Sequence, residues 1–166
     1  MNNLDDLNNI KKLDKRNALE SIKQLPLQCK QAWNDSNSLK FPKDYEEVSK
    51  IIISGMGGSA YGARIVKSLY DGSQLSKIPT ELVNGYLLPG YVNENSLAIF
   101  SRYSGTTEET IACAQQAKLK RAKIPGITSG GELANFLKEN NYPSYFFNPI
   151  YNPSAHPRIG VGYMVM

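Results

Sequence analysis

Residues 51–60 read IIISGMGGSA, an apolar run that ends in a glycine-rich turn. A compact β-branched run bounded by glycine is typical of a buried parallel strand. The glycines allow a sharp turn and a close approach to a ligand, because they carry no Cβ. Ser59 then stands where a helix N-cap is expected, with the helix running to Tyr70. Free N–H groups and the positive end of the helix dipole meet at such a position, so we interpret this loop as a phosphate site.

Strands and helices alternate along the chain from residue 50 onward. The pattern predicts strands at 50–54, 80–84, 97–101, 124–128 and 144–147, and helices at 60–70, 107–121 and 132–139. This alternation is typical of an α/β fold, with a five-stranded parallel sheet that carries helices on both faces. Pro125 indicates an edge position or a strand start for the fourth strand. In such a sheet, ligands bind at the carboxyl ends of the strands.

The first 49 residues follow a different pattern, and we expect them to form a helical lead-in to the domain at 50–166. Apolar residues recur at spacings of three and four over residues 4–24, which predicts one amphipathic helix. Pro26 is expected to interrupt it. A second helix then carries Trp33, which we expect in the core, and a turn-rich loop covers residues 34–38.

The composition excludes several classes of function. Hydrophobic residues make up 41% of the chain and charged residues 20%, which is ordinary for a globular domain. The net charge of +4 suits a small anionic substrate, but the lysines are scattered, which argues against nucleic-acid binding. Cys29 and Cys113 stand far apart and give neither a disulfide framework nor a metal site. With a polar start and no apolar run approaching roughly 18 residues, we expect no signal peptide, no membrane span and a cytoplasmic location.

A second polar stretch follows the third predicted strand. Residues 101–110 read SRYSGTTEET, in which hydroxyl side chains gather around an arginine and a glycine. Hydroxyl groups donate hydrogen bonds to phosphate oxygens. Alternatively, Thr106 and Glu109 form a capping box and Ser104 only shapes the turn. Because the loop at 55–59 lies at the same end of the sheet, we predict that both loops face one phosphosugar pocket.

The order of these motifs resembles that of the bifunctional phosphoglucose/phosphomannose isomerases, which are two-lobed members of the sugar isomerase (SIS) superfamily. The resemblance rests on residues 55–60 and 103–110, then ITSGG at 127–131, Pro157-Arg158 and Gly162-Tyr163, with LPLQ at 25–28 in the lead-in. It covers nearly the whole chain. It implies an SIS-type three-layer αβα sandwich that binds an aldose or ketose 6-phosphate, with a homodimer as the expected assembly.

The resemblance also implies roles for individual residues. Reversible isomerisation of glucose 6-phosphate or mannose 6-phosphate with fructose 6-phosphate would follow, through an enediolate and without a metal or redox cofactor. Arg158 matches the arginine that lies by the sugar and stabilises the enediolate. The implied phosphate ligands are Gly57, Gly58, Ser59, Ser104 and Thr107.

The chain departs from the family in two ways. Arg102 replaces a serine that contacts phosphate, and it either supplies a fork of donors to the phosphate or swings outward; we include it among the candidate ligands. The family also has a second SIS lobe, which supplies the glutamate base and a ring-opening histidine. His156 is not that histidine, and we expect it in a loop near the pocket mouth. Glu108 and Glu109 are expected to serve the helix dipole. We therefore hypothesise that this chain is the N-terminal lobe of a longer enzyme.

Two other functions fit parts of the pattern. A sugar-phosphate sensor built on one SIS lobe would bind the ligand without catalysis, which would explain the missing base. A dinucleotide-binding domain would use the glycine pattern of residues 55–60. That fingerprint requires an acidic residue near the end of the second strand, whereas this chain has Val83-Asn84-Gly85 there and Glu81 at the other end.

Overall fold

The centre of the protein is a five-stranded parallel sheet. The computed structural model describes residues 5–73, 78–104 and 107–165. The strands are β1 (Lys50–Ser54), β2 (Thr80–Val83), β3 (Ser96–Arg102), β4 (Gly126–Thr128) and β5 (Ser144–Phe146), in the order β2-β1-β3-β4-β5. Every neighbouring pair is parallel, which confirms the predicted sheet. Pro125 directly precedes β4, which lies between two strands, so this proline marks a strand start.

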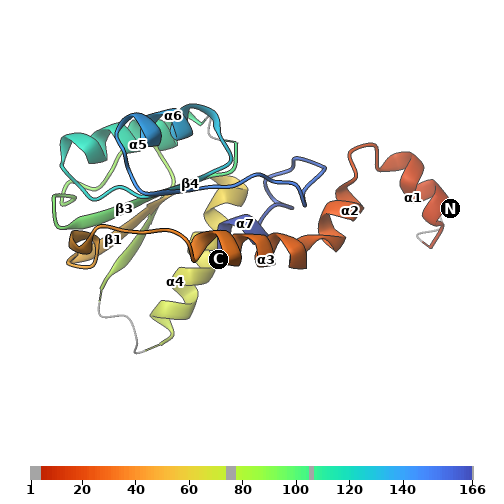
Figure 1. Cartoon of the computed structure of the whole chain (residues 1–166), viewed down its shortest axis with the longest axis horizontal. Coiled ribbons are helices and arrows are strands. Elements are labelled where there is room, and N and C mark those ends of the chain that lie inside the picture. Colours follow the sequence, from red (N-terminus) through yellow and green to blue (C-terminus); the bar gives the residue numbers. More distant parts are fainter. Residues whose placement is uncertain (1–4, 74–77, 105–106, 166) are drawn as a thin grey trace.

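Helices cover both faces of this sheet. α5 (Glu108–Leu119) and α6 (Gly131–Glu139) lie on one face (Figure 1). α3 (Leu25–Ser36), α4 (Ala60–Asp71) and the short α7 (Gly162–Val165) lie on the other. The result is the predicted three-layer αβα sandwich, in which a parallel sheet hides both its faces from water.

The core has two parts, one on each side of the sheet. Under α5 and α6, apolar side chains of the strands pack against the helices, with Phe100, Ile124 and Leu133 fully buried. On the other side, an aromatic cluster joins β5 to α3 and α7. There the rings of Phe147 and Tyr163 stack with centroids 4.9 Å apart. This second cluster attaches the helical lead-in to the sheet.

The lead-in differs from the single helix expected over residues 4–24. It forms α1 (Leu7–Leu13) and α2 (Ala18–Lys23), which extend away from the sheet (Figure 1). The carboxylate of Asp14 accepts hydrogen bonds from the backbone N–H groups of Ala18 and Leu19, at 2.7 and 2.8 Å. Asn17 has a left-handed φ of 55°. This local capping breaks the helix although the apolar spacing continues through it.

The next helix confirms one expectation and corrects two others. α2 ends at Lys23 and α3 begins at Leu25, so the helical path is interrupted next to Pro26 as expected, and Pro26 lies in the first turn of α3, where its missing N–H costs nothing. The helix continues to Ser36, so the loop expected over 34–38 starts later. Trp33 is 57% exposed, and the expectation that it lies in the core is wrong. Two 3₁₀ turns complete the elements, η1 (Lys43–Tyr45) before β1 and η2 (Gly57–Ser59) after it.

Candidate functional site

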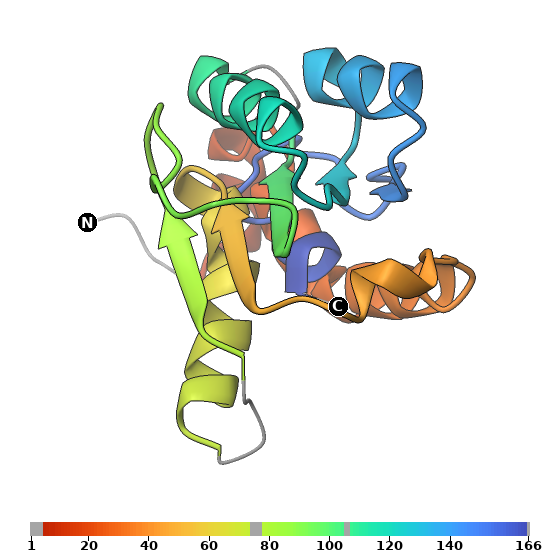
Figure 2. The same ribbon diagram turned by 90° about the vertical axis from the view of Figure 1, so that its left-hand side faces the viewer.

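The two polar loops of the sequence lie at one edge of the sheet. β1 and β3 are neighbours, and Figure 2 shows strands side by side with their arrowheads toward the same edge. The chain leaves β1 towards β2 on one side, whereas β3 leads to β4 on the other. In sheets of this strand order, the gap between β1 and β3 is the switch point at which ligands bind. The predicted location of the site therefore agrees with the topology.

Ser59 joins the two loops through buried hydrogen bonds. Its Oγ accepts a hydrogen bond of 2.9 Å from the backbone N–H of Tyr103, and its carbonyl accepts one of 2.9 Å from Ser101 Oγ. Ser59 stands at the N-cap position of α4, but its backbone is helical and its side chain does not cap the helix. The expected side-chain cap is therefore wrong, because Tyr103 already uses the oxygen. A serine hydroxyl that accepts one hydrogen bond still has its own proton to donate, so Ser59 remains a candidate ligand.

The glycines of the first loop allow the chain near Arg158 to approach. Gly58 is buried, and a Cβ built on it would lie 2.9 Å from the backbone N of Arg158 and 3.0 Å from the carbonyl carbon of Pro157. Only a residue without a side chain tolerates this approach. Gly57 is exposed and has a left-handed φ of 54°, which glycine adopts without strain. The backbone of Arg158 thus lies against the glycine loop, while the Arg158 side chain is exposed.

Tyr103 connects the same loops to the segment before α7. Asn152 Nδ2 donates a hydrogen bond of 2.6 Å to the Tyr103 hydroxyl. A Cβ at Gly160 would clash with the Tyr103 ring, so this glycine lets the segment close over the ring. Burial raises the pKa of Tyr103, while the hydrogen bond from Asn152 lowers it by a smaller amount. The phenol therefore stays neutral at neutral pH. Neither Asn152 nor Gly160 was predicted as a site residue, since no spacing pattern connects residues about fifty positions apart.

Arg102 brings positive charge to the end of β3. Its Nη2 donates a hydrogen bond of 3.2 Å to Ser104 Oγ. Its Nε and Nη1 are buried, and within the described parts of the chain they have no hydrogen-bond partner. Burial lowers the pKa of Arg102, and the nearby Glu109 carboxylate opposes this shift. Buried donors on a charged group are costly unless an acceptor satisfies them, so this side chain is suited to an anion.

The remaining predicted residues have more ordinary positions. Thr107 is the N-cap residue of α5, with extended backbone and no capping hydrogen bond from its side chain. The capping-box alternative involves Thr106, which lies outside the described residues. Glu108 and Glu109 are in the first turn of α5 beside the hydroxyl of Tyr86, whose pKa is raised chiefly by the charge of Glu109. His156 is exposed in a loop.

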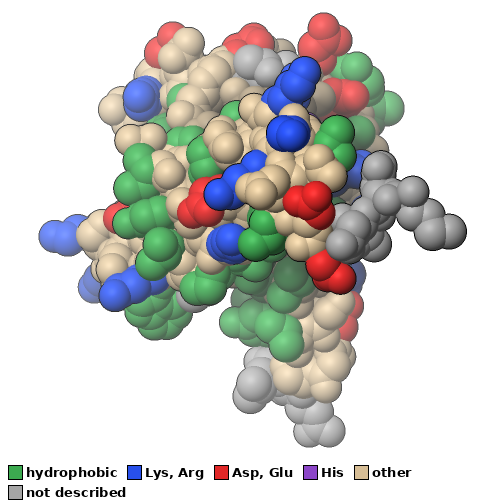
Figure 3. Space-filling model, turned by 90° about the vertical axis from the view of Figure 1, so that its right-hand side faces the viewer, with side chains coloured by type: hydrophobic (Ala, Val, Ile, Leu, Met, Phe, Trp, Pro, Cys, Tyr) green, Lys and Arg blue, Asp and Glu red, His purple; other side chains and the backbone are tan. Residues whose placement is uncertain are grey.

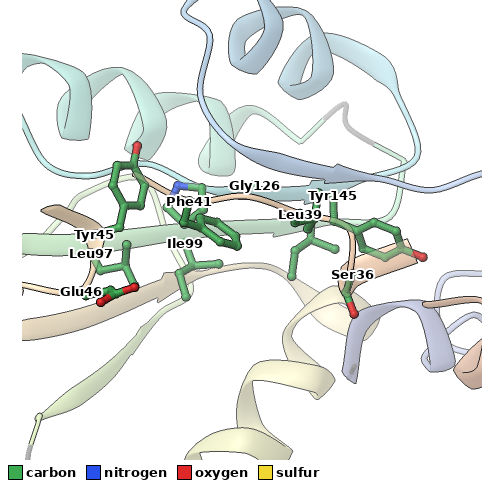
Figure 4. Close-up of a pocket in the computed structure, with 11 residues that line it drawn as sticks. Ser36, Leu39, Phe41, Tyr45, Glu46, Leu97, Ile99, Gly126 and Tyr145 are labelled. Atoms are coloured by element: carbon green, nitrogen blue, oxygen red, sulfur yellow. The ribbon is translucent and has the colours of Figure 1, made fainter. Parts of the chain in front are cut away.

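An apolar groove is separate from these loops. It has a volume of about 450 Å³ and lies against the sheet face of β3 and β4, next to the end of the lead-in (Figure 4). Leu97, Ile99 and Ile127 form its floor, and Phe41 and Tyr45 flank it. Its lining is almost entirely apolar and contains no lysine or arginine, so it does not suit a phosphate.

The described residues lack the features of several other kinds of site. Within the ranges given above, no three His, Cys, Asp or Glu side chains are grouped as a metal site would require. None of the helices described is both long and apolar enough to cross a bilayer. On the face in Figure 3, positive and negative side chains are interspersed rather than gathered into one basic stripe.

Comparison with known proteins places these motifs in a family context. No protein-family model matches the chain. The chain is 37% identical over 145 residues to a bifunctional phosphoglucose/phosphomannose isomerase of Caldicellulosiruptor bescii, covering 87% of this chain and 41% of that protein. It is 35% identical over 133 residues to the enzyme of the same name from Thermoplasma volcanium, covering 78% and 39%. The chain thus spans about two fifths of the length of these relatives.

Solved structures support the fold. A Clostridium difficile 630 protein proposed to be a phosphosugar isomerase superposes with a TM-score of 0.60 at 16% identity, covering 89% of this chain and 45% of that one. A Bacillus subtilis protein with the same description gives a TM-score of 0.52 at 20% identity, covering 72% and 39%. At such identities the likeness shows the SIS-type fold and nothing about the ligand.

Proposed function

Because this chain is related over most of its length to the bifunctional phosphoglucose/phosphomannose isomerases, we propose that it is the phosphosugar-binding part of an aldose–ketose isomerase. The single observation that carries the proposal is the meeting of three segments at the switch point of the sheet. The glycine loop at 57–59 and the end of β3 are joined through Ser59 and Tyr103, and Arg158 lies against Gly58. Each of these segments carries backbone N–H groups, hydroxyls or a guanidinium, which are groups suited to an anion.

The phosphate of a sugar 6-phosphate would bind between the ends of β1 and β3. Glycines leave backbone N–H groups accessible to an anion, hydroxyls donate to its oxygens, and Arg102 has two buried donors without a partner among the described residues. In this proposal Arg102 performs the task that the family gives to a serine. The proposed ligands are Gly57, Gly58, Ser59, Arg102, Ser104 and Thr107.

The chemistry would be proton transfer between neighbouring carbons. A carboxylate base removes the proton from C2 of glucose 6-phosphate or mannose 6-phosphate and returns it to C1, which gives fructose 6-phosphate. The enediolate formed between these steps carries negative charge, and the Arg158 guanidinium would stabilise it. The proposal requires no metal or redox cofactor. It further includes a homodimer and a cytoplasmic location.

The base would come from a second SIS lobe. Glu108 and Glu109 lie in the first turn of α5, and both carboxylates already interact with the hydroxyl of Tyr86. The relatives are more than twice as long as the part that this chain matches, which leaves room for such a lobe. We accordingly treat residues 1–49 as the helical lead-in and 50–166 as the first SIS domain.

The same observation keeps a second function open. A sensor that binds a sugar phosphate without converting it needs no base. Among the described residues from β3 to the end of α5, the carboxylates are those of Glu108 and Glu109, and both already interact with the Tyr86 hydroxyl. A dinucleotide site has less support, because Asn84 follows the end of β2 where that fingerprint needs a carboxylate.

Titration calorimetry with fructose 6-phosphate tests the binding proposal. Replacing Ser104 with Ala or Arg102 with Met removes donors to a charged group, so the Kd should rise by at least about tenfold. Ser38→Ala, an exposed serine that bonds within its own turn, is the matched control and should leave the Kd unchanged. Equal affinity for fructose and fructose 6-phosphate would contradict the phosphate site.

An isomerase assay on a protein that contains both lobes separates the enzyme from the sensor. The enzyme should interconvert glucose 6-phosphate and fructose 6-phosphate, whereas a sensor would bind both without turnover. Arg158→Ala should reduce kcat more than it raises KM, because the charge that Arg158 stabilises is greatest in the transition state. A loss confined to KM would instead indicate a plain binding role.

A further inference from the structure

Gln28, in the LPLQ stretch of the lead-in, makes an unusual set of buried contacts. Its side chain is fully buried, and its Nε2 faces three backbone carbonyls. The acceptors are the carbonyls of Ser21 at 3.2 Å, Tyr151 at 2.9 Å and Ile159 at 3.1 Å. An amide nitrogen has two protons to donate, so all three carbonyls share them. The amide oxygen cannot take this position, because it would meet three acceptors.

Two of these carbonyls are at the two ends of the loop that carries Arg158. Tyr151 begins this loop and Ile159 ends it, so one side chain of α3 holds its ends together. A second contact from the lead-in is nearby, where the backbone N–H of Ser154 donates to Ser21 Oγ at 3.0 Å.

The loop has no helix or strand of its own from residue 151 to residue 160. Its conformation therefore depends on such contacts. Gln28 also sets the distance to α7, since a Cβ at Gly162 would lie 2.6 Å from the Gln28 Cβ. The side chain is thus enclosed by the loop on one side and by the start of α7 on the other.

We propose that Gln28 is a positioning residue that holds Arg158 at the glycine loop, an inference that rests on the proposed function. Without its Nε2, two loop carbonyls lose their buried donor, and the loop would shift to find other partners. Arg158 would then leave the place where its backbone meets Gly58. The phosphate ligands should be affected less, because they come from β1, β3 and the segments that follow them, and the hydrogen bond between Ser59 and Tyr103 does not involve the loop.

The first test measures the loop directly. His156 is the only histidine in the sequence and lies in this loop, so its imidazole NMR signal reports on the loop alone. Gln28→Met keeps the length of the side chain but removes both donors, and it should shift or broaden this signal at fixed pH. The matched control is Gln24→Met at the N-cap of the same helix, where the amide donates to Glu20 Oε1 within the lead-in at 2.7 Å. An unchanged His156 signal in folded Gln28→Met would overturn the proposal.

The second test measures the consequence for the site. An aldonate phosphate imitates the enediolate with its carboxylate, whereas inorganic phosphate probes only the phosphate ligands. Gln28→Met should raise the Kd of the aldonate phosphate about tenfold and change that of inorganic phosphate much less. In an Arg158→Ala background the same substitution should add little, because residues that act through one another are not additive. Equal losses for both ligands, or full additivity, would overturn the positioning role.

Failure of the proposed function gives a different result. In that case the unmodified protein binds neither ligand, and the His156 signal alone decides whether Gln28 holds the loop. Should Gln28→Met not fold, Gln28→Glu keeps the shape of the side chain. Burial beside carbonyl oxygens disfavours a carboxylate and raises the pKa of such a glutamate, so its neutral acid at pH 5 retains one donor, while its carboxylate at pH 8 retains none. The amide signals of the loop should then match the unmodified protein at pH 5 and depart from it at pH 8, and identical signals at both pH values would reject the proposal.

Discussion

Gly58→Ala is the sharpest test of how the glycine loop and the Arg158 segment fit together. The added Cβ would lie 2.9 Å from the Arg158 backbone N, 3.0 Å from the Pro157 carbonyl carbon and 3.1 Å from the Arg158 Cα. All three are backbone atoms, so no side chain can rotate out of the way. Ordinary van der Waals contact begins near 3.4 Å, and the two segments must therefore separate by about half an ångström.

The expected cost follows from the behaviour of overpacked sites. Forcing atoms into a well-packed region costs about 1–3 kcal/mol. For a chain of this length, 1 kcal/mol corresponds to about 2–4 °C in the melting temperature, so a cost of about 2 kcal/mol lowers the Tm by about 4–8 °C. The affinity for an enediolate mimic should also fall, because Arg158 moves with its backbone.

Thermal denaturation of two variants checks this reasoning. Gly85→Ala is the control, since a Cβ there meets nothing within 4 Å and the backbone lies outside the left-handed region. Its Tm should stay the same or rise slightly, because alanine restricts the unfolded chain. If Gly58→Ala had the same Tm as Gly85→Ala, the close approach of Arg158 to the glycine loop would be refuted.

Three further perturbations have expected outcomes. Ser59→Ala leaves the buried N–H of Tyr103 without its acceptor and should lower the free energy of unfolding in urea by about 1–3 kcal/mol; an unchanged value would mean that this hydrogen bond is not formed. Gly62→Ala would put a Cβ 1.8 Å from the Met164 carbonyl oxygen, so near-UV circular dichroism should report displacement of α7, and a native spectrum would contradict the packing of α4 on α7. The pKa of Asp14 is lowered by hydrogen bonds from the first backbone amides of α2, so its stabilisation of α2 is present above the ordinary value of 3.8 and is lost as the pH falls through the lowered value. NMR shifts of α2 should follow this loss on acidification, and Asp14→Asn should abolish the pH dependence.

The sheet was predictable because its strands have strong local patterns. The run Ile51–Ile53 and the other strands were found within a few residues of their ends, and the alternation with helices predicted parallel pairing. The glycine loop and the polar stretch after β3 were also identified, since both loops follow strands whose carboxyl ends meet at one edge.

The lead-in was less predictable because competing local interactions decide its course. The apolar spacing across residues 4–24 is that of one helix, yet Asp14 ends α1 and begins α2 by accepting backbone hydrogen bonds. Trp33 is a large aromatic residue of a kind that is often buried, but the buried face of α3 carries Gln28 and Ala32 instead. The periodicity identifies an apolar stripe without indicating which part of the stripe finds a partner.

Local order along the chain was enough to predict the strand–helix pattern and the two polar loops that follow β1 and β3, whereas Arg158 was singled out by the family resemblance. Three contacts depend on the tertiary structure. The backbone of Arg158 packs against Gly58, Ser59 Oγ accepts a hydrogen bond from the Tyr103 N–H, and Gln28 contacts both ends of the Arg158 loop. Short-range patterns come from the geometry of one helix or strand, whereas these contacts join segments more than forty residues apart. Their positions depend on how the layers pack, and no periodicity in the sequence records that.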